Sequence, residues 1–455
     1  MSGRIKEEDV AHVRERSPID EVIADYVQLK SAGGGQKKGL CPFHDEKSPS
    51  FHVTPSKGFF HCFGCQASGD VIAFLMKIDH LSFTETIERL ADRMGYQLRY
   101  EQGNFTPAPA GNRSRLIAAN ALAAKFYQEQ LNTSPLAAHA RELMTKRGFD
   151  KGACETFGVG YAPDEWDALS SYLTEQGFKA DVLSDVGLAF TNKSNRLQDS
   201  FRARIMFPIF SDNGDAVAFG GRILPGSTDP AKYKNSAETK IYFKSKTLYG
   251  MNWAKSDVVK DDQVIVCEGY TDVIGFHRSG VPRAVATCGT SLTEEHVRMM
   301  KRFATKVVLA FDADKAGQGA AEKFYAWEEK YQVRVSVARF PDGKDPGDLA
   351  SSDPEALALA IKDAVPFLRF RLDRVIAAQP QRTPEDRARL ASLAMQVINE
   401  HPDVNVRKLY AGEVATIVGL PVADLTRLAE RRSTQPVVSA PTPRASGDSD
   451  SAEFI

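Results

Sequence analysis

The sequence predicts a multidomain protein of mixed α+β and α/β class, and three observations support this fold class. Two Cys/His pairs near the N-terminus indicate a metal-bound ribbon. Apolar strands that alternate with helices between residues 262 and 348 indicate a parallel sheet with flanking helices, and a helical pattern follows residue 352. The 455 residues, of which 42% are hydrophobic, suffice for about two to four domains.

The first element is a ribbon with four candidate zinc ligands, Cys41, His44, Cys62 and Cys65. Each pair is separated by two residues, which is the spacing by which a turn of backbone delivers two ligands to one tetrahedral Zn²⁺. His52 and His61 lie nearby, but only His44 repeats the spacing of the cysteine pair. His61 precedes Cys62 directly, so its side chain should point to the opposite face of the strand. We therefore expect one structural zinc ion.

The segment between the two pairs, residues 47–61, alternates aromatic with polar or basic residues. This pattern predicts two short strands that present stacking rings and phosphate-binding groups, which is a suitable face for single-stranded nucleic acid. Two amphipathic helices, 69–76 and 82–90, should complete a first domain that spans residues 1–101.

Residues 102–112 are rich in Pro, Gly and Ala and predict a flexible linker, so the first domain should move relative to the rest. Residues 113–255 then mix helices with two apolar runs, 204–210 and 216–223. The turn Asp212-Asn213-Gly214-Asp215 between these runs predicts a hairpin. This part should form a basic α+β subdomain.

The parallel sheet is expected in residues 256–349. Its four predicted strands are 264–267, 284–287, 307–311 and 333–337, with helices starting near residues 270, 293 and 319. Near-continuous apolar strands of this kind are typical of a sheet covered on both faces. A helical subdomain, 350–432, and a disordered tail rich in Ser and Pro, 433–455, should follow.

Acidic residues stand at the predicted carboxyl ends of these strands, where reactive groups gather in open parallel sheets. They are Glu268, Asp312, Asp314, Asp345 and Asp348. A single acid is most often a solvated loop residue, and Asp345 and Asp348 could instead cap a helix beginning at Leu349. Solvated loops or helix caps do not readily explain why acids from three separate segments all follow strands at one sheet edge. Oxygen ligands without Cys or His suit Mg²⁺ or Mn²⁺, and two such ions would support phosphoryl or nucleotidyl transfer.

A basic cluster with interleaved aromatic residues precedes the acidic segments. Its members are Arg196, Arg202, Arg204, Arg222, Lys232, Lys234, Lys240, Lys244 and Lys246. A charged surface would be the simpler explanation of the cluster alone, but its position before the acids favours a groove for phosphates and stacked bases. The 58 Lys and Arg nearly balance the 59 Asp and Glu, so nucleic acid would be held by local patches.

The six cysteines leave three outside the zinc pairs, in stretches that read as buried, and disulfides are not expected. Neither a signal peptide nor an apolar run of membrane-spanning length is visible. We therefore expect a cytoplasmic protein.

Residues 39–51 and 60–65 resemble the CHC2 zinc ribbon of bacterial DnaG-type replicative DNA primases, while Glu268-Gly269-Tyr270-Thr271-Asp272 and Phe311-Asp312-Ala313-Asp314 resemble their Toprim motif. The resemblance extends from residue 5 to about residue 420. It implies that zinc binds to the four ligands above, and that Glu268, Asp312, Asp314 and Asp345 bind catalytic metal. The positions that match the family's template- and nucleotide-binding stretches are Arg147, Arg222, Lys232, Asn235 and Lys244.

The resemblance also implies the activity of a DNA-directed RNA polymerase that makes short RNA primers at the replication fork. Its partners would be a single-stranded DNA template, ribonucleoside triphosphates and the RNA–DNA hybrid product, bound by a monomer away from any membrane. Where many relatives carry Asp-Pro-Asp, this chain has Asp345-Pro346-Gly347-Asp348, so either acid could bind the metal. The helical domain that docks on the replicative helicase in this family is expected to be absent here, because the chain stops soon after its tail; either the sequence is truncated or the protein lacks this dock.

Two other functions fit parts of the pattern. DNA strand cleavage would use the same metal-binding fold but needs a tyrosine nucleophile, and would leave a covalent protein–DNA adduct. A non-catalytic zinc-ribbon DNA-binding protein would retain its function after Asp312→Ala, whereas a primase would lose synthesis and keep DNA binding. A fused helicase is disfavoured because the phosphate-loop pattern G-x-x-x-x-G-K-[ST] is missing from the sequence.

Overall fold

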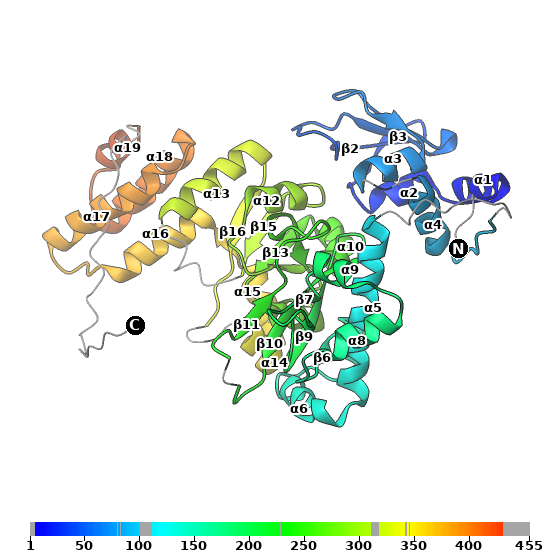
Figure 1. Ribbon diagram of the computed structural model, residues 1–455. Coiled ribbons are helices and arrows are strands. Elements are labelled where there is room, and N and C mark those ends of the chain that lie inside the picture. The colour runs from blue at the N-terminus through cyan, green and yellow to red at the C-terminus, as the bar shows by residue number, and fades with distance from the viewer. Residues whose placement is uncertain are drawn as a thin grey trace. The chain divides into compact units, whose positions relative to one another are not determined.

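The computed structural model describes residues 5–79, 81, 83–100, 112–227, 229–310, 318–341, 344 and 346–430. Contacts divide the chain into a larger unit, residues 1–316 and 326–366, and a smaller unit, residues 317–325 and 367–455. Figure 1 shows the order of the elements along the chain. The predicted tail and all but the last residue of the predicted linker lie outside the described residues.

The N-terminal ribbon is a five-stranded antiparallel sheet in the order β1-β2-β3-β4-β5. Its elements are α1 (Glu7–Glu15), α2 (Ile19–Ala24), β1 (Lys30–Gly33), β2 (Gln36–Gly39), β3 (Phe51–Thr54), β4 (Phe59–Cys62), β5 (Ser68–Gly69), α3 (Val71–Ile78) and α4 (Phe83–Arg93). Phe51 and Phe60 occupy the buried face of the sheet and pack against Phe74 of α3, at ring-centroid distances of 6.1 and 5.5 Å. The predicted strands and both predicted helices are confirmed.

A four-stranded antiparallel sheet in the order β11-β10-β9-β6 follows. The elements of this part are α5 (Asn112–Thr133), α6 (Ala138–Lys146), α7 (Lys151–Thr156), β6 (Gly160–Ala162), α8 (Ala168–Glu175), α9 (Ala180–Asp185), β7 (Ala189–Thr191), β8 (Leu197–Asp199), β9 (Arg204–Phe210), β10 (Ala216–Ile223) and β11 (Tyr233–Asn235). The predicted hairpin is confirmed, since the Ser211 N–H donates to the Asp215 carbonyl at 2.8 Å between β9 and β10.

The third sheet has six strands in the order β12-β14-β13-β15-β16-β17. Its elements are β12 (Leu248–Tyr249), α10 (Met251–Asp261), β13 (Gln263–Cys267), α11 (Tyr270–Arg278), β14 (Ala284–Thr287), α12 (Glu294–Lys301), β15 (Lys306–Leu309), α13 (Gln318–Tyr331), β16 (Arg334–Val337), α14 (Pro346–Ser352), α15 (Pro354–Lys362) and β17 (Val365–Pro366). The four central strands are parallel, as predicted. The short edge strands β12 and β17 are antiparallel and were not predicted.

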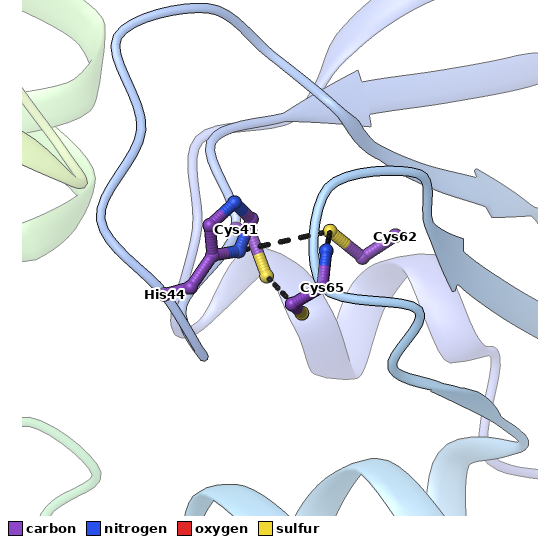
Figure 2. Close-up of side chains that lie close together, drawn as sticks. All are labelled: Cys41, His44, Cys62 and Cys65. Atoms are coloured by element: carbon purple, nitrogen blue, oxygen red, sulfur yellow. Dashed lines mark hydrogen bonds between the residues drawn. The ribbon is translucent and has the colours of Figure 1, made fainter.

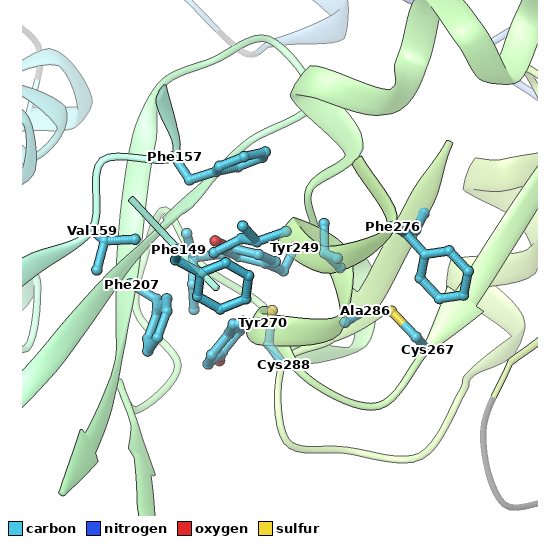
Figure 3. Packing of buried hydrophobic residues seen from close by; sticks show 14 of the residues in the cluster. Phe149, Phe157, Val159, Phe207, Tyr249, Cys267, Tyr270, Phe276, Ala286 and Cys288 are labelled. Atoms are coloured by element: carbon cyan, nitrogen blue, oxygen red, sulfur yellow. The ribbon is translucent and has the colours of Figure 1, made fainter. Parts of the chain in front are cut away.

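One hydrophobic core joins the second and third sheets (Figure 3). Phe207 of β9 stacks on Tyr270 of α11 with ring centroids 5.4 Å apart. Phe157 of the α+β part packs against Trp253 of α10 at 4.8 Å. The basic subdomain and the parallel sheet are therefore packed as one body, which fixes the basic residues relative to the sheet.

Among its described residues, the smaller unit contains the first part of α13 and four complete helices, α16 (Phe367–Ala378), α17 (Pro384–Asn399), α18 (Val404–Val418) and α19 (Val422–Glu430). Leu390, Ala394, Val414 and Ala415 form the centre of their core. The predicted helical subdomain was drawn from residue 350, but α14 and α15 belong to the larger unit. The physical reason is that Leu349, Leu357 and Ile361 of these helices belong to the core shared with the parallel sheet.

None of the helices described here combines the length and the apolar character needed to cross a lipid bilayer.

Candidate functional site

The four candidate zinc ligands converge in the ribbon (Figure 2). Strand register brings the two turns together, because Gly39 of β2 pairs with Phe51, which pairs with Cys62 of β4. The four ligand atoms all lie within 4.8 Å of one another. The Sγ atoms of Cys41 and Cys65 are 3.8 Å apart, and Cys62 Sγ lies 3.8 Å from Nδ1 of His44. A tetrahedral zinc ion with Zn–S bonds of about 2.3 Å separates two sulfurs by about 3.8 Å, so this donor set fits zinc.

Backbone amides support the sulfurs of both turns. The Phe43 N–H donates to Cys41 Sγ and the Cys65 N–H donates to Cys62 Sγ, each at 3.4 Å. Cys41 and Cys62 are buried, whereas Cys65 is exposed. Such bonds favour the thiolate form that a metal requires.

The two competing histidines point away from this cluster. His52 and His61 are paired across β3 and β4, on the face opposite the buried Phe51 and Phe60. Both rings contact Phe63, at centroid distances of 5.1 and 4.6 Å, and the Phe63 side chain is 64% exposed. The prediction that His61 faces away from the zinc ligands is therefore confirmed. The exposed ring of Phe63 offers a stacking surface beside the metal cluster.

Arg222 and Arg147 carry guanidinium nitrogens that are buried and have no hydrogen-bond partner among the described residues. They are Nε and Nη1 of Arg222, at the end of β10, and Nε of Arg147, after α6. Burial lowers the pKa of Arg222, and the positive charge of Arg147 lowers it further, while Tyr233 raises it. Two uncompensated cations near each other are arranged to receive an anion such as phosphate.

Arg202 lies in a groove of about 690 Å³ that also contains Trp166, Phe190 and Lys234. Its guanidinium carbon lies 3.3 Å from the centroid of the Trp166 ring, which is a close cation–π contact. The Trp166 side chain is 60% exposed and Phe190 is 47% exposed. Burial lowers the pKa of Lys234. Sequence reasoning missed both aromatic residues, although an isolated tryptophan in the acidic stretch 164–167 was the available signal.

Three members of the predicted basic cluster have acidic partners, and in one of these pairs Nη2 of Arg202 lies 3.7 Å from Oδ1 of Asp164. Arg204 is 2% exposed and bonds through Nη2 to Asp229 at 2.5 Å. Lys240 bonds to Asp185 at 2.8 Å. Lys232 is exposed, and Lys244 is half-buried. The cluster is thus divided between residues that hold the fold together and residues whose charge is available to a ligand.

Glu268 stands at the carboxyl edge of the parallel sheet, one residue beyond β13, and its side chain is exposed. The neighbouring strand β15 ends at the same level, since the Ala310 N–H donates to the Val266 carbonyl at 2.8 Å. Because β13 and β15 are parallel, the chain leaves both strands at this edge. The edge is where ligands of open α/β sheets bind.

Of the other predicted metal-binding acids, only Asp348 belongs to the residues that the structure describes. Asp312, Asp314 and Asp345 lie outside the described residues, so their convergence with Glu268 stays a prediction. Asp348 is exposed in the first turn of α14, which begins at Pro346 rather than at the expected Leu349.

A direct hydrogen bond joins the basic region to this edge. The hydroxyl of Tyr270, two residues after Glu268, donates to Oδ1 of Asn235 at 2.8 Å. Gly289 leaves room for the same amide, because a Cβ there would lie 2.3 Å from Asn235 Nδ2. Asn235 therefore has a fixed orientation, with its oxygen bound to Tyr270 and its NH₂ group turned toward the loop after β14.

Four sequence families match successive parts of the chain. They are the CHC2 zinc finger at residues 5–105, the N-terminal domain of the DNA primase catalytic core at 126–255, a Toprim-like family at 265–350, and the DnaB-helicase binding domain of primase at 368–423.

Curated relatives and solved structures agree with these matches. The chain is 44% identical to a DNA primase of Streptomyces coelicolor over 92% of its own length and 66% of the relative's, and 41% identical to one of Mycobacterium tuberculosis over 92% and 67%. It thus spans about two thirds of the length of these relatives. The RNA polymerase domain of M. tuberculosis primase DnaG, solved with a double-stranded DNA oligomer carrying a 6-nucleotide overhang, matches with a TM-score of 0.63 and 37% identity, over 68% of this chain and 98% of that one.

The expectation that a helicase-docking domain is absent is wrong. The match to the helicase-binding family covers α16, α17, α18 and the beginning of α19. Sequence reasoning recognised these helices as a helical subdomain but gave them no partner, because an amphipathic pattern reveals a buried face and not what binds the opposite face.

Proposed function

Because the chain belongs to the bacterial DnaG-type DNA primase family, we propose that it is a DNA-directed RNA polymerase that synthesises short RNA primers on single-stranded DNA. The 3′ hydroxyl of one nucleotide attacks the α-phosphate of the next ribonucleoside triphosphate, and pyrophosphate leaves. The product is an RNA–DNA hybrid. Catalysis of this kind depends mainly on positioning and on neutralising phosphate charge.

One observation carries this proposal: arginine residues without compensating partners among the described residues are linked to the sheet edge that bears Glu268. Arg222 and Arg147 present buried nitrogens without partners among the described residues, as a phosphate-binding pair would. The Tyr270–Asn235 bond ties the neighbouring strand β11 to the turn after Glu268. A nucleotide held by the arginines would therefore have its phosphates near that edge.

The cofactors in this proposal are one structural zinc ion and catalytic Mg²⁺ or Mn²⁺. Zinc would be held by the four residues of the ribbon cluster. The divalent ions would be held by Glu268, Asp312 and Asp314, with Asp345 or Asp348. When bound, such ions make the attacking hydroxyl more acidic and neutralise the leaving pyrophosphate.

The template would follow two aromatic surfaces. The groove combines the Trp166 ring with Arg202 and Lys234, although Asp164, Asp199 and Asp229 also line it. Phe63 gives the ribbon a second stacking position. The related M. tuberculosis domain was solved with DNA that has a single-stranded overhang, which supports DNA binding by this core. The zinc ribbon would help to select the start site and hold the new primer.

The match at residues 368–423 supports a second partner, the replicative helicase. We assign helicase docking to the helices of the smaller unit and place the protein at the replication fork in the cytoplasm, as a monomer. Retention of helicase by the immobilised full chain, and its loss on deletion of residues 367–430, would test this assignment.

The decisive test of the polymerase function is incubation with a single-stranded template, labelled ribonucleotides and Mg²⁺, with and without chelator. Short oligoribonucleotides that disappear with chelator or with Asp312→Ala, while DNA binding persists, are the expected result. Unchanged synthesis by Asp312→Ala would overturn the assignment of the acids. A covalent protein–DNA adduct after denaturation would indicate strand cleavage instead.

A further inference from the structure

We propose that Glu46 is the positioning residue of the zinc centre, because its carboxylate holds three of the four ligands in place. This inference rests on the proposed zinc site. Glu46 lies two residues after His44, and its side chain is only 10% exposed. A nearly buried carboxylate is unfavourable unless hydrogen-bond donors surround it, and this one has four groups within bonding reach.

One oxygen of Glu46 holds the backbone of the first turn. Oε1 accepts hydrogen bonds from the N–H groups of Cys41, at 2.6 Å, and Ser50, at 3.1 Å. The same oxygen thereby ties the first zinc ligand to the residue that precedes β3. Charge-assisted bonds of this type are about twice as strong as neutral ones.

The other oxygen faces the remaining ligands. Oε2 lies 3.3 Å from Nε2 of His44 and accepts a hydrogen bond from the Ser50 hydroxyl. Ser50 Oγ in turn lies 3.2 Å from Cys62 Sγ. Glu46 thus reaches Cys41 and His44 directly and Cys62 through Ser50.

The contact with His44 determines which ring nitrogen is available to a metal. Nδ1 is the nitrogen that faces Cys62 Sγ, at 3.8 Å. A proton on Nε2, held by Glu46, leaves the lone pair of Nδ1 free for zinc. Carboxylates that bind the outer nitrogen of a metal-bound histidine fix its tautomer and orientation.

Gly64, in the second turn, packs directly against this network. A Cβ at position 64 would lie 2.5 Å from His44 Nε2 and 2.9 Å from Ser50 Oγ. The second turn can therefore approach the histidine only because residue 64 lacks a side chain. The two turns and Glu46 form one close-packed assembly around the ligand atoms.

The test compares zinc affinity of the full chain with that of Glu46→Gln and Glu46→Ala, by competition with a chromogenic chelator. Glu46→Gln keeps the size of the side chain but replaces an acceptor oxygen by an NH₂ group. We expect zinc affinity to fall about 10- to 100-fold in Glu46→Gln and further in Glu46→Ala. The matched control is Asp45→Asn, since Asp45 is 53% exposed and faces Arg298 at 3.5 Å.

A second readout separates positioning from general stability. The absorption bands of the Co²⁺-substituted protein report ligand geometry, and should shift in Glu46→Gln and in Gly64→Ala but not in Asp45→Asn. Ser50→Ala, which removes the link to Cys62, should weaken zinc binding less than Glu46→Gln. These measurements need no nucleotide, so a failure of the polymerase assignment would leave them unaffected.

The proposal is overturned if Glu46→Gln binds zinc within twofold of the unchanged chain, or if Asp45→Asn weakens binding equally. Should Glu46→Ala fail to fold, the Gln and Ser50→Ala variants decide the question by the same criteria.

Discussion

The zinc ribbon and the basic site on β10 differ in how their charged groups are compensated. Around the zinc ligands, the nearly buried Glu46 has donors at both oxygens. At the basic site, buried nitrogens of Arg222 and Arg147 have no partner among the described residues. In the ribbon, donors from the protein itself satisfy both oxygens of Glu46, and only the metal comes from outside. In the proposed function an anion from outside would complete the arrangement at the basic site, and this would distinguish a substrate site from a structural centre.

The strongest test of this contrast is Arg222→Met, which keeps most of the side-chain volume and removes the charge. Primer synthesis should fall on the order of 100-fold, as when one donor to a developing negative charge is removed. The thermal unfolding temperature should be unchanged or higher, since the 8% exposed cation has no acidic partner among the described residues. Primer yield and calorimetry on the same preparation measure both effects.

Arg334→Ala is the control for a lost surface charge, because Arg334 is exposed on β16. It should change neither property appreciably. A large loss of stability in Arg222→Met would mean that Arg222 serves the fold, and the contrast with the ribbon would disappear.

Glu328 provides an incompletely compensated acid to compare with Glu46. It accepts one bond, from the Val335 N–H at 2.7 Å, and burial raises its pKa from 4.5 to about 7. The stability that comes from this raised pKa is complete below pH 4.5 and is lost as the pH rises through 7. Glu328→Gln should therefore unfold with less dependence on pH, and be more stable by about 3 kcal/mol at pH 8.

Denaturant unfolding of both proteins at pH 5 and pH 8 gives the comparison. If the difference between them is the same at both pH values, titration of Glu328 does not contribute to stability.

Phe63 tests whether the ribbon binds template through the exposed ring beside its zinc ligands. Phe63→Ala should weaken binding of a single-stranded oligonucleotide by about tenfold, because a stacked base contributes about 1–3 kcal/mol. Fluorescence anisotropy measures the affinity, and zinc content should not change. Phe83→Ala, in α4, removes another exposed ring, 44% exposed, and should leave the affinity unaltered. Equal losses in both variants would contradict a specific stacking position.

The smallest expected effect concerns two buried tyrosines of the shared core. The Tyr270 hydroxyl donates to Asn235, whereas the Tyr249 hydroxyl has no partner among the described residues. Tyr270→Phe removes one hydrogen bond, with a net free energy of about 1 kcal/mol. If Asn235 binds the nucleotide, this loss should raise the KM for nucleotide about fivefold. Tyr249→Phe should be neutral or stabilising. A change in KM for both variants, or for neither, would remove the positioning role of Tyr270.

The features that the sequence predicted correctly are those encoded locally. The zinc cluster depends on two short spacings, and the parallel strands on continuous apolar runs such as 264–267. The hairpin followed from the turn at Asn213-Gly214. The choice of His44 over His61 followed from the alternation of side chains along a strand, which needs no knowledge of the fold.

The features that were missed depend on contacts between distant segments. Arg204 looked like a ligand-binding residue until the chain placed Asp229 beside it. Trp166 became recognisable only through its contact with Arg202. The edge strands β12 and β17 have two residues each, too few for a pattern. Glu46 gave no signal of its own, because its role depends on where its side chain turns.

The core shared by the second and third sheets has a consequence for dissecting the protein. A truncation at residue 255, the boundary suggested by composition, would separate Phe207 from Tyr270 and leave an aromatic surface open to water on each fragment. Neither fragment would be expected to remain monodisperse in isolation. The two halves should melt together in a single cooperative transition, so fragments for expression are better cut between the ribbon and α5 than inside this body.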